Sequence, residues 1–134
     1  MKKFAIYTVL LALFSCNLSM EEMDYDIRPR IKNNSEKVIY FGSQHNYPDT
    51  AIELNNPLKV SSRRVNPGET VVSRASNWEP KFNSTSHGII MFFIYDDALQ
   101  DVPWDTIKAN YMILRRYDLT WDSLVYMNYI IEYP

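Results

Sequence analysis

One stretch of the sequence is apolar at seven successive positions, Ile89-Ile90-Met91-Phe92-Phe93-Ile94-Tyr95. A strand with one face in water alternates apolar and polar residues, whereas a run without a polar break indicates that both faces are covered. Asp96-Asp97 ends the run. The stretch therefore predicts a strand in the middle of a sheet, with packing on both of its faces.

Shorter segments on either side have the composition of further strands. The candidates are residues 27–32, 37–41, 58–65, 69–74, 111–117 and 129–133. Asn66-Pro67-Gly68-Glu69 suits a type II turn, because proline presets φ at the second position and glycine accepts a positive φ at the third. Pro29 cannot donate to a strand ladder, so the first strand is expected at a sheet edge.

The aromatic residues and the presence of only three glycines also suit β structure. We expect a mainly β fold, a single antiparallel β-sandwich of Ig-like type over residues 27–134, with one or two short helices. An open α+β sheet is the alternative.

The clearest helix is expected near residues 120–128. Thr120 can accept a capping hydrogen bond, Asp122 favours the helix dipole, and Leu119 can pack on Leu124 across the first turn. A second helical turn is expected after Asp105.

Two polar stretches, residues 42–57 and 76–88, are expected to be loops. In the second of them, Trp78 and Phe82 are expected to turn inward, because large aromatic side chains bury much apolar surface.

The N-terminal segment differs in character from the rest. Lys2-Lys3 precede an apolar stretch, Phe4 to Phe14, that is shorter than the roughly 20 residues needed to span a bilayer. Leu13-Phe14-Ser15-Cys16 resembles the bacterial lipobox, in which cleavage falls before the cysteine and diacylglycerol is joined to its sulfur. The resemblance implies a signal peptide at residues 1–15 and lipidation of Cys16. The alternative is an ordinary secretory signal with a chance cysteine.

Residues 16–26 contain four acids and no base. They form an acidic tether, which serves as a solvated spacer or resembles the surface-export signal of Bacteroidota lipoproteins. The net charge is −2, and it is −4 without Lys2 and Lys3. Such a balance argues against a nucleic-acid partner. Cys16 is the only cysteine, so no disulfide is expected in the domain.

Several short stretches carry a wider resemblance. They are Arg115-Arg116-Tyr117-Asp118-Leu119-Thr120-Trp121-Asp122-Ser123-Leu124, Asn128-Tyr129-Ile130-Ile131-Glu132-Tyr133-Pro134, Tyr47-Pro48-Asp49-Thr50 and Pro67-Gly68-Glu69. Together with the lipobox, they resemble small uncharacterised lipoproteins of the Bacteroidales. The resemblance implies a cell-envelope address and no known activity, and it transfers no functional residue except Cys16.

Candidate catalytic and metal-binding residues are few. His45 and His87 each stand alone in a polar stretch, without the ligand spacing of a zinc site. No Gly-x-Ser-x-Gly elbow accompanies them. Asp96, Asp97 and Asp101 lack the glycine and the ligand spacing of a calcium loop, and a solvated turn is expected there. We therefore expect no catalytic residues, no metal and no cofactor.

The paired arginines, Arg63-Arg64 and Arg115-Arg116, could bind a carboxylate or a phosphate. Successive residues of a strand point to opposite faces, so neither pair can aim both side chains at one anion. We expect these pairs to lie at solvated edges.

Trp78, Trp104 and Trp121 are expected mainly in the core, because each ring buries a large apolar area. Trp104 follows Pro103 in a polar stretch, and it is the one expected to be exposed. It is therefore the candidate for an aromatic contact with a sugar or protein ligand.

Asp49-Thr50-Ala51 resembles the O-glycosylation acceptor of Bacteroidota envelope proteins, which makes Thr50 a candidate site. Asp105-Thr106-Ile107 and Asp122-Ser123-Leu124 fit the same pattern but are better explained as helix starts.

Three functions follow. The leading hypothesis is a lipid-anchored outer-membrane protein, favoured at the cell surface, that serves as a non-enzymatic binding or interaction module for a protein or glycan. The second is a periplasm-facing structural subunit of an envelope complex. The third, a small hydrolase, requires residues 42–57 and 76–88 to converge so that His45 or His87 meets a nucleophile and an acid.

Overall fold

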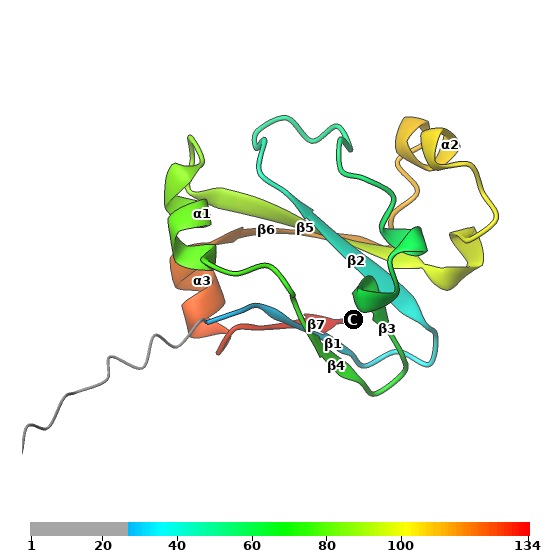
Figure 1. Cartoon of the computed structure of the whole chain (residues 1–134), viewed down its shortest axis with the longest axis horizontal. Helices are drawn as coiled ribbons and strands as arrows, with labels where there is room; N and C mark the ends of the chain where they lie inside the picture. The colour runs from blue at the N-terminus through cyan, green and yellow to red at the C-terminus, as the bar shows by residue number, and fades with distance from the viewer. Residues whose placement is uncertain (1–26) are drawn as a thin grey trace, which may run out of the picture.

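The computed structural model describes residues 27–134 (Figure 1). These residues form seven strands: β1 (Arg30–Asn33), β2 (Ile39–Gln44), β3 (Arg64–Val65), β4 (Thr70–Val72), β5 (Ile89–Asp96), β6 (Arg115–Thr120) and β7 (Ile130–Tyr133). They also form three helices: α1 (Trp78–Ser84), α2 (Trp104–Ala109) and α3 (Trp121–Tyr126). Three short 3-10 turns complete the list: η1 (Pro57–Lys59), η2 (Ser61–Arg63) and η3 (Asp97–Leu99). The expectation of a mainly β fold is confirmed. The expected signal peptide (1–15), the lipidated Cys16 and the acidic tether (16–26) lie outside the described residues.

Four of the strands form an antiparallel sheet in the order β3-β2-β5-β6. β5 pairs with β2 on one side and β6 on the other, and its six inner residues are buried. The prediction of a central strand over Ile89–Tyr95 is therefore confirmed.

The remaining strands form a second sheet in the order β4-β1-β7. β1 pairs antiparallel with β4 but parallel with β7, so the expectation of a wholly antiparallel arrangement is wrong for this pair. The expected edge position of the first strand is also wrong, since β1 lies in the middle. Pro29 precedes the strand, and its carbonyl accepts a hydrogen bond from Ser73 N at 2.9 Å. Its missing N–H therefore removes no ladder bond.

The two faces of β5 belong to different hydrophobic clusters. One face, with Ile90, Phe92 and Ile94, packs with Ile31 and Ile131 of the second sheet. The other face carries Met91, Phe93 and Tyr95, which pack with Tyr40, Ile52, Leu58 and Ile107. Side chains alternate along a strand, so burial of both faces requires every residue to be apolar. This explains the uninterrupted run in the sequence.

α1 lies where residues 76–88 were expected to form a loop, and that expectation is wrong. The inward positions of Trp78 and Phe82 are confirmed, with 2% and 1% of each exposed. They lie four residues apart on one helix face, and Trp78 stacks on Phe92 with ring centroids 5.6 Å apart. Packing against the sheet, rather than helix propensity, thus determines this helix.

α3 begins as predicted. The Thr120 side chain accepts a hydrogen bond from Ser123 N at 3.1 Å, and Leu124 is fully buried. α1 and α3 lie side by side at one end of the molecule (Figure 1). The ring centroids of Phe82 in α1 and Trp121 in α3 are 5.7 Å apart. α2 lies near the opposite end and starts at Trp104, one residue before Asp105.

Two expected strands differ from those observed. Residues 58–65 form η1, η2 and only a two-residue β3, because Asn56 caps the turn at Leu58 N (3.0 Å) and Pro57 starts it. The strand expected at 111–117 begins only at Arg115, since Tyr111 has a φ of 50° that strands do not adopt. The turn at 66–69 is confirmed, with Glu69 N bonded to Asn66 O at 3.0 Å and a φ of 74° at Gly68.

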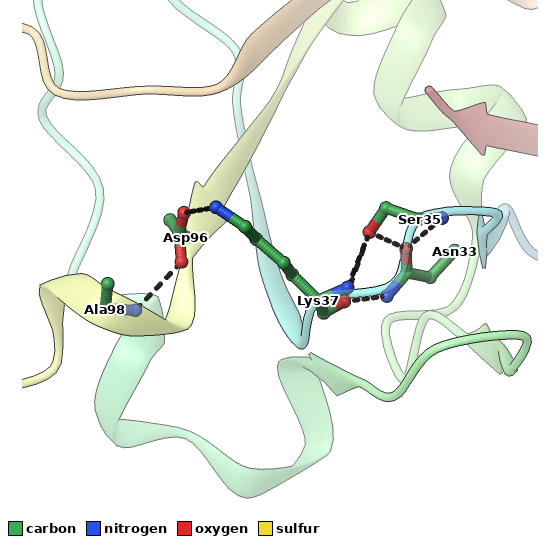
Figure 2. Close-up of polar contacts among 5 residues, drawn as sticks. All are labelled: Asn33, Ser35, Lys37, Asp96 and Ala98. Carbon is green, nitrogen blue, oxygen red and sulfur yellow. Dashed lines mark hydrogen bonds and ion pairs between the residues drawn. The ribbon is translucent and has the colours of Figure 1, made fainter.

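Asn33 joins the two sheets. Its fully buried side chain donates to Lys37 O at 2.6 Å (Figure 2). It also donates to Val65 O of β3 at 3.1 Å. Its side-chain oxygen accepts from Ser35 N at 2.9 Å. The last residue of β1 is thus bonded to Lys37, two residues before β2, and to Val65 of β3, and both of these strands belong to the other sheet.

We predict that Asn33→Ala lowers the free energy of unfolding by about 1–3 kcal/mol, because the buried Val65 O loses its side-chain donor, while Lys37 O keeps only the bond from Ser35 Oγ at 3.1 Å. The neighbouring Asn34 is exposed, with one side-chain bond to Glu132 at 2.9 Å. Asn34→Ala is therefore the matched control and should cost less than about 1 kcal/mol. Urea unfolding followed by circular dichroism measures both. Equal losses would contradict the role assigned to Asn33.

Tyr95 yields a second prediction. Its hydroxyl is buried and has no hydrogen-bond partner among the described residues. Tyr95→Phe removes a desolvated polar group, so the free energy of unfolding should rise by about 1 kcal/mol. Tyr117→Phe is the control and should lose about that amount, since the Tyr117 hydroxyl donates to Glu132 O at 2.6 Å. A loss of stability in Tyr95→Phe would show that its hydroxyl contributes to folding.

Candidate functional site

A cleft lies over the edge of β2, and we call it the β2-edge cleft. Its volume is about 190 Å³. The residues that line it are Phe41, Gly42, Ser43, Val60, Ser62, Arg63, Ser73, Arg74, Ala75 and Trp78.

The cleft exists because β3 is shorter than β2. β3 pairs with β2 only at Ile39 and Tyr40, whereas β2 continues to Gln44. Before β3, the chain lies beside β2 as the turns η1 and η2 and not as a paired strand. Each of these turns is closed by a backbone bond, Val60 N to Pro57 O (3.1 Å) and Arg63 N to Val60 O (2.9 Å). The stretch Phe41–Gln44 therefore has a strand on one side only within the described sheet.

Two arginines give the cleft a positive charge. Arg63 is half-buried and Arg74 is exposed. In the part of the chain that the structure describes, no carboxylate forms an ion pair with either of them.

The position of Arg63 is defined by its surroundings. Its Nη1 atom lies 3.6 Å from the point that a Cβ atom would occupy on Gly42. Burial raises the pKa of the Tyr95 phenol, Tyr111 adds to that rise, and the charge of Arg63 opposes it. The guanidinium group thus lies at the boundary between the cleft and the cluster that contains Tyr95.

Arg63 and Arg64 have different environments, but Arg63 is the last residue of η2 and only Arg64 lies in a strand, so the alternation expected along a strand does not apply to this pair. Arg64 is exposed and its Nη1 atom donates to Asn66 Oδ1 at 2.6 Å. The second pair also separates, because Arg115 lies over the Tyr117 ring (5.2 Å) whereas Arg116 pairs with Asp118 (2.8 Å). Arg63 is the exception to the expected solvated edges. Nothing in the sequence distinguishes it from Arg64, so sequence reasoning did not find the cleft.

Each histidine lies near the segment that carries the other one. Both segments lie at the same end of the sheet, after the last residue of β2 and before the first residue of β5. The register pairs Gln44 with Met91, so the residues after β2 lie opposite those before β5. Tyr47 meets His87 edge-on with ring centroids 5.6 Å apart, and His45 lies 6.5 Å from Trp78. Residues 42–57 and 76–88 therefore converge, which is the condition that the hydrolase hypothesis set.

The convergence does not build a catalytic triad from the described residues. Ser86 Oγ lies 2.9 Å from His87 Nδ1, but both residues are exposed and no carboxylate pairs with either histidine there. An acid that orients the imidazole is part of such a site. Likewise, residues 27–134 contain no group of three or more His, Cys, Asp or Glu that could hold a metal ion.

His45 is exposed as a residue, yet its ring lies beside Trp78 and near a cation. Partial burial lowers the pKa of His45, and the charge of Lys81 lowers it further. Lys81 Nζ itself lies 5.1 Å from the centre of the Trp78 ring. The neutral imidazole is therefore favoured in the folded protein.

Trp104 is half-buried, so the exposure expected for it is only partial. Its indole N–H donates to Leu54 O at 3.2 Å, and its ring meets Tyr95 edge-on at 5.5 Å. These contacts make Trp104 part of the packing around the Tyr95 cluster.

Thr50 lies half-buried in the loop after β2, as expected, and Asp49 Oδ1 accepts from Ala51 N at 2.9 Å. This bond is typical of a turn, which is the alternative explanation for the Asp-Thr pair. Glycosylation of Thr50 stays a prediction. Thr106 and Ser123 lie in α2 and α3, as expected of helix starts. Asp96 caps Ala98 N at 2.9 Å and pairs with Lys37 at 3.6 Å, which agrees with a turn at this position.

No helix within residues 27–134 has the length and apolar character to cross a membrane. No protein-family model matches the chain, and neither a curated protein nor a solved structure is detectably similar to it.

The lowered pKa of His45 predicts a pH dependence of stability. An imidazole whose pKa is lower in the folded than in the unfolded state stabilises the fold above the unfolded value of 6.5, and this stabilisation is lost as the pH falls through the folded pKa. His45→Gln should therefore flatten the decline in unfolding free energy between roughly pH 7 and pH 5. Urea unfolding at a series of pH values measures the slope, and an unchanged slope in the variant would contradict the prediction.

Proposed function

We propose that this chain is a lipid-anchored, non-enzymatic binding module of the bacterial cell envelope, and that the β2-edge cleft is its ligand site. The observation that carries the proposal is Arg63, a half-buried cation in a cleft without a carboxylate partner among the described residues. A charge taken partly out of water costs free energy unless an opposite charge offsets it. A ligand with a negative group would supply that charge.

The envelope address rests on the N-terminal residues. The basic and apolar start predicts export, and the lipobox-like residues before Cys16 predict a lipid anchor. Residues 16–26 would then tether the domain to the outer membrane, with the cell surface as the favoured face. The resemblance to small Bacteroidales lipoproteins points to the same address.

The two sheets support a finer description of the fold. We propose a β-sandwich of Ig-like type, in which β4-β1-β7 packs on β3-β2-β5-β6. Its support is the cluster that Ile31 and Ile131 of one sheet share with Ile39, Phe92 and Ile94 of the other. The parallel pairing of β1 with β7 is the feature that departs from a wholly antiparallel sandwich.

A second function has an observation in its favour. A mainly apolar groove of about 310 Å³ is lined by Asp96, Ala98, Leu99, Met112, Ile113 and Leu114, and 40% of Leu114 is exposed. An apolar surface of this kind suits a subunit that docks on a larger assembly. The alternative is therefore a periplasm-facing structural subunit of an envelope complex.

Protease treatment of intact cells separates the two functions. We predict that a C-terminal tag on the chain is removed from intact cells, because the proposed export of the anchored domain to the cell surface would expose the tag to the protease. Cys16→Ala is the control, and its product should be released from the membrane fraction. Protection of the tag until the outer membrane is opened would contradict the surface assignment and favour the periplasmic subunit.

A further inference from the structure

We propose that the β2-edge cleft binds an extended peptide that carries a carboxylate. The peptide backbone would lie along Phe41–Ser43, and its carboxylate would meet the guanidinium group of Arg63, with Arg74 as the second cation. This inference rests on the proposed function, since it names the ligand class of the same site.

The direction of the backbone groups in β2 favours a peptide. Asp97 N donates to Val38 O at 3.3 Å, and in an antiparallel ladder alternate residues direct both backbone groups to the same neighbour. The even-numbered residues of β2 therefore direct their backbone N–H and C=O groups towards β5. The odd-numbered Phe41 and Ser43 direct their N–H and C=O groups to the opposite side, beyond the point where β3 ends. Both residues line the cleft, so an added strand would find backbone partners there.

The charge of the cleft favours a carboxylate on that peptide. A guanidinium group is planar and can donate two parallel hydrogen bonds to a carboxylate. Arg63 is partly shielded from water, which strengthens such a pair relative to one in open solvent. Neither Arg63 nor Arg74 has an acidic partner among the described residues that would have to be displaced.

The walls of the cleft argue against a sugar. Sugar rings stack on exposed aromatic faces, and Trp78 is only 2% exposed while Phe41 is 6% exposed. The volume of about 190 Å³ is also below the roughly 300–1,000 Å³ of most small-molecule pockets. A space of that size suits one or two residues of an extended chain, with the rest of the chain outside.

The test is a titration of the isotope-labelled full-length chain in detergent micelles, followed by the NMR signals of its backbone amides. Three tetrapeptide probes share their first three residues and differ in the last residue and its end group: N-acetyl-Val-Ser-Val-Ala with a free C-terminus, N-acetyl-Val-Ser-Val-Asp amide, and N-acetyl-Val-Ser-Val-Asn amide. The two amides are the matched pair, with and without a side-chain carboxylate. We expect the two acidic peptides to shift the amide signals of Phe41, Gly42 and Ser43. The neutral peptide should bind about tenfold more weakly. Comparison of the two acidic peptides shows whether a chain end or a side chain is preferred.

Two variants with the same loss of charge test the role of Arg63. Arg63→Ala should weaken binding of the acidic peptides by about tenfold or more, whereas Arg64→Ala should leave it unchanged. Arg63→Lys keeps the charge but loses the planar fork, and it should fall between them. The dispersion of the same NMR spectra shows whether each variant is folded.

Four results would overturn the peptide proposal. Equal binding of the neutral peptide would show that the cleft does not recognise a carboxylate. Equal binding of acetate alone would show that it does not recognise a peptide backbone. Shifts caused only by trigalacturonic acid would assign the cleft to an acidic glycan, and the binding function would then survive. If no probe shifts these signals and Arg63→Ala matches Arg64→Ala throughout, the cleft is no ligand site and the binding function fails with it.

Discussion

The buried side chain of Asn33 is the interaction on which the arrangement of the two sheets depends. It bonds the end of β1 to Lys37 O and Val65 O, and the backbone of the same residue accepts from Gly68 N at 2.8 Å and donates to Glu69 O at 3.0 Å. The chain passes between the sheets twice at this corner, once after β1 and once after β3. The hydrogen bonds of Asn33 stabilise the position of the chain at both passages, because a buried carbonyl without a hydrogen-bond donor costs free energy.

The same corner influences the open edge of β2. The bond from Asn33 to Val65 O holds the C-terminal end of β3, and the turn η2 directly precedes its N-terminal end. Between these limits β3 has two residues, and Phe41–Gln44 of β2 lie beyond its reach. The cleft is therefore a consequence of how the sheets are connected. Exposed strand edges are usually protected against association with other chains, and here η2 and the residues before α1 flank the edge so that only a narrow opening remains.

β5 provides the other constraint on the architecture. A central strand with two apolar faces needs cover on both sides, and the second sheet with α1 and α3 covers one of them. The other face is covered by Ile52 of a loop, Leu58 of η1 and Ile107 of α2, not by another sheet. The long connections between β2 and β3 and between β5 and β6 thus have a packing role. The same connections bring Arg63 to the cleft and Trp104 to Tyr95.

The sequence by itself determined the features that depend on neighbouring residues. The apolar run over Ile89–Tyr95 can be satisfied only by burial on both faces, Thr120 caps the helix that follows it, and Pro67-Gly68 suits one type of turn. Only the tertiary structure decided the features that depend on distant ones. Residues 78–84 are helical because Trp78 and Phe82 pack on Phe92 and Trp121. β1 is central because β4 and β7 both pair with it, and Pro29 lies before the strand, where its missing N–H does not prevent this. The candidate site is of the second kind. Arg63 and Arg64 are identical neighbours in the sequence, and they differ only because β3 ends between η2 and the Asn33 corner, which leaves one guanidinium in a cleft and the other beside Asn66.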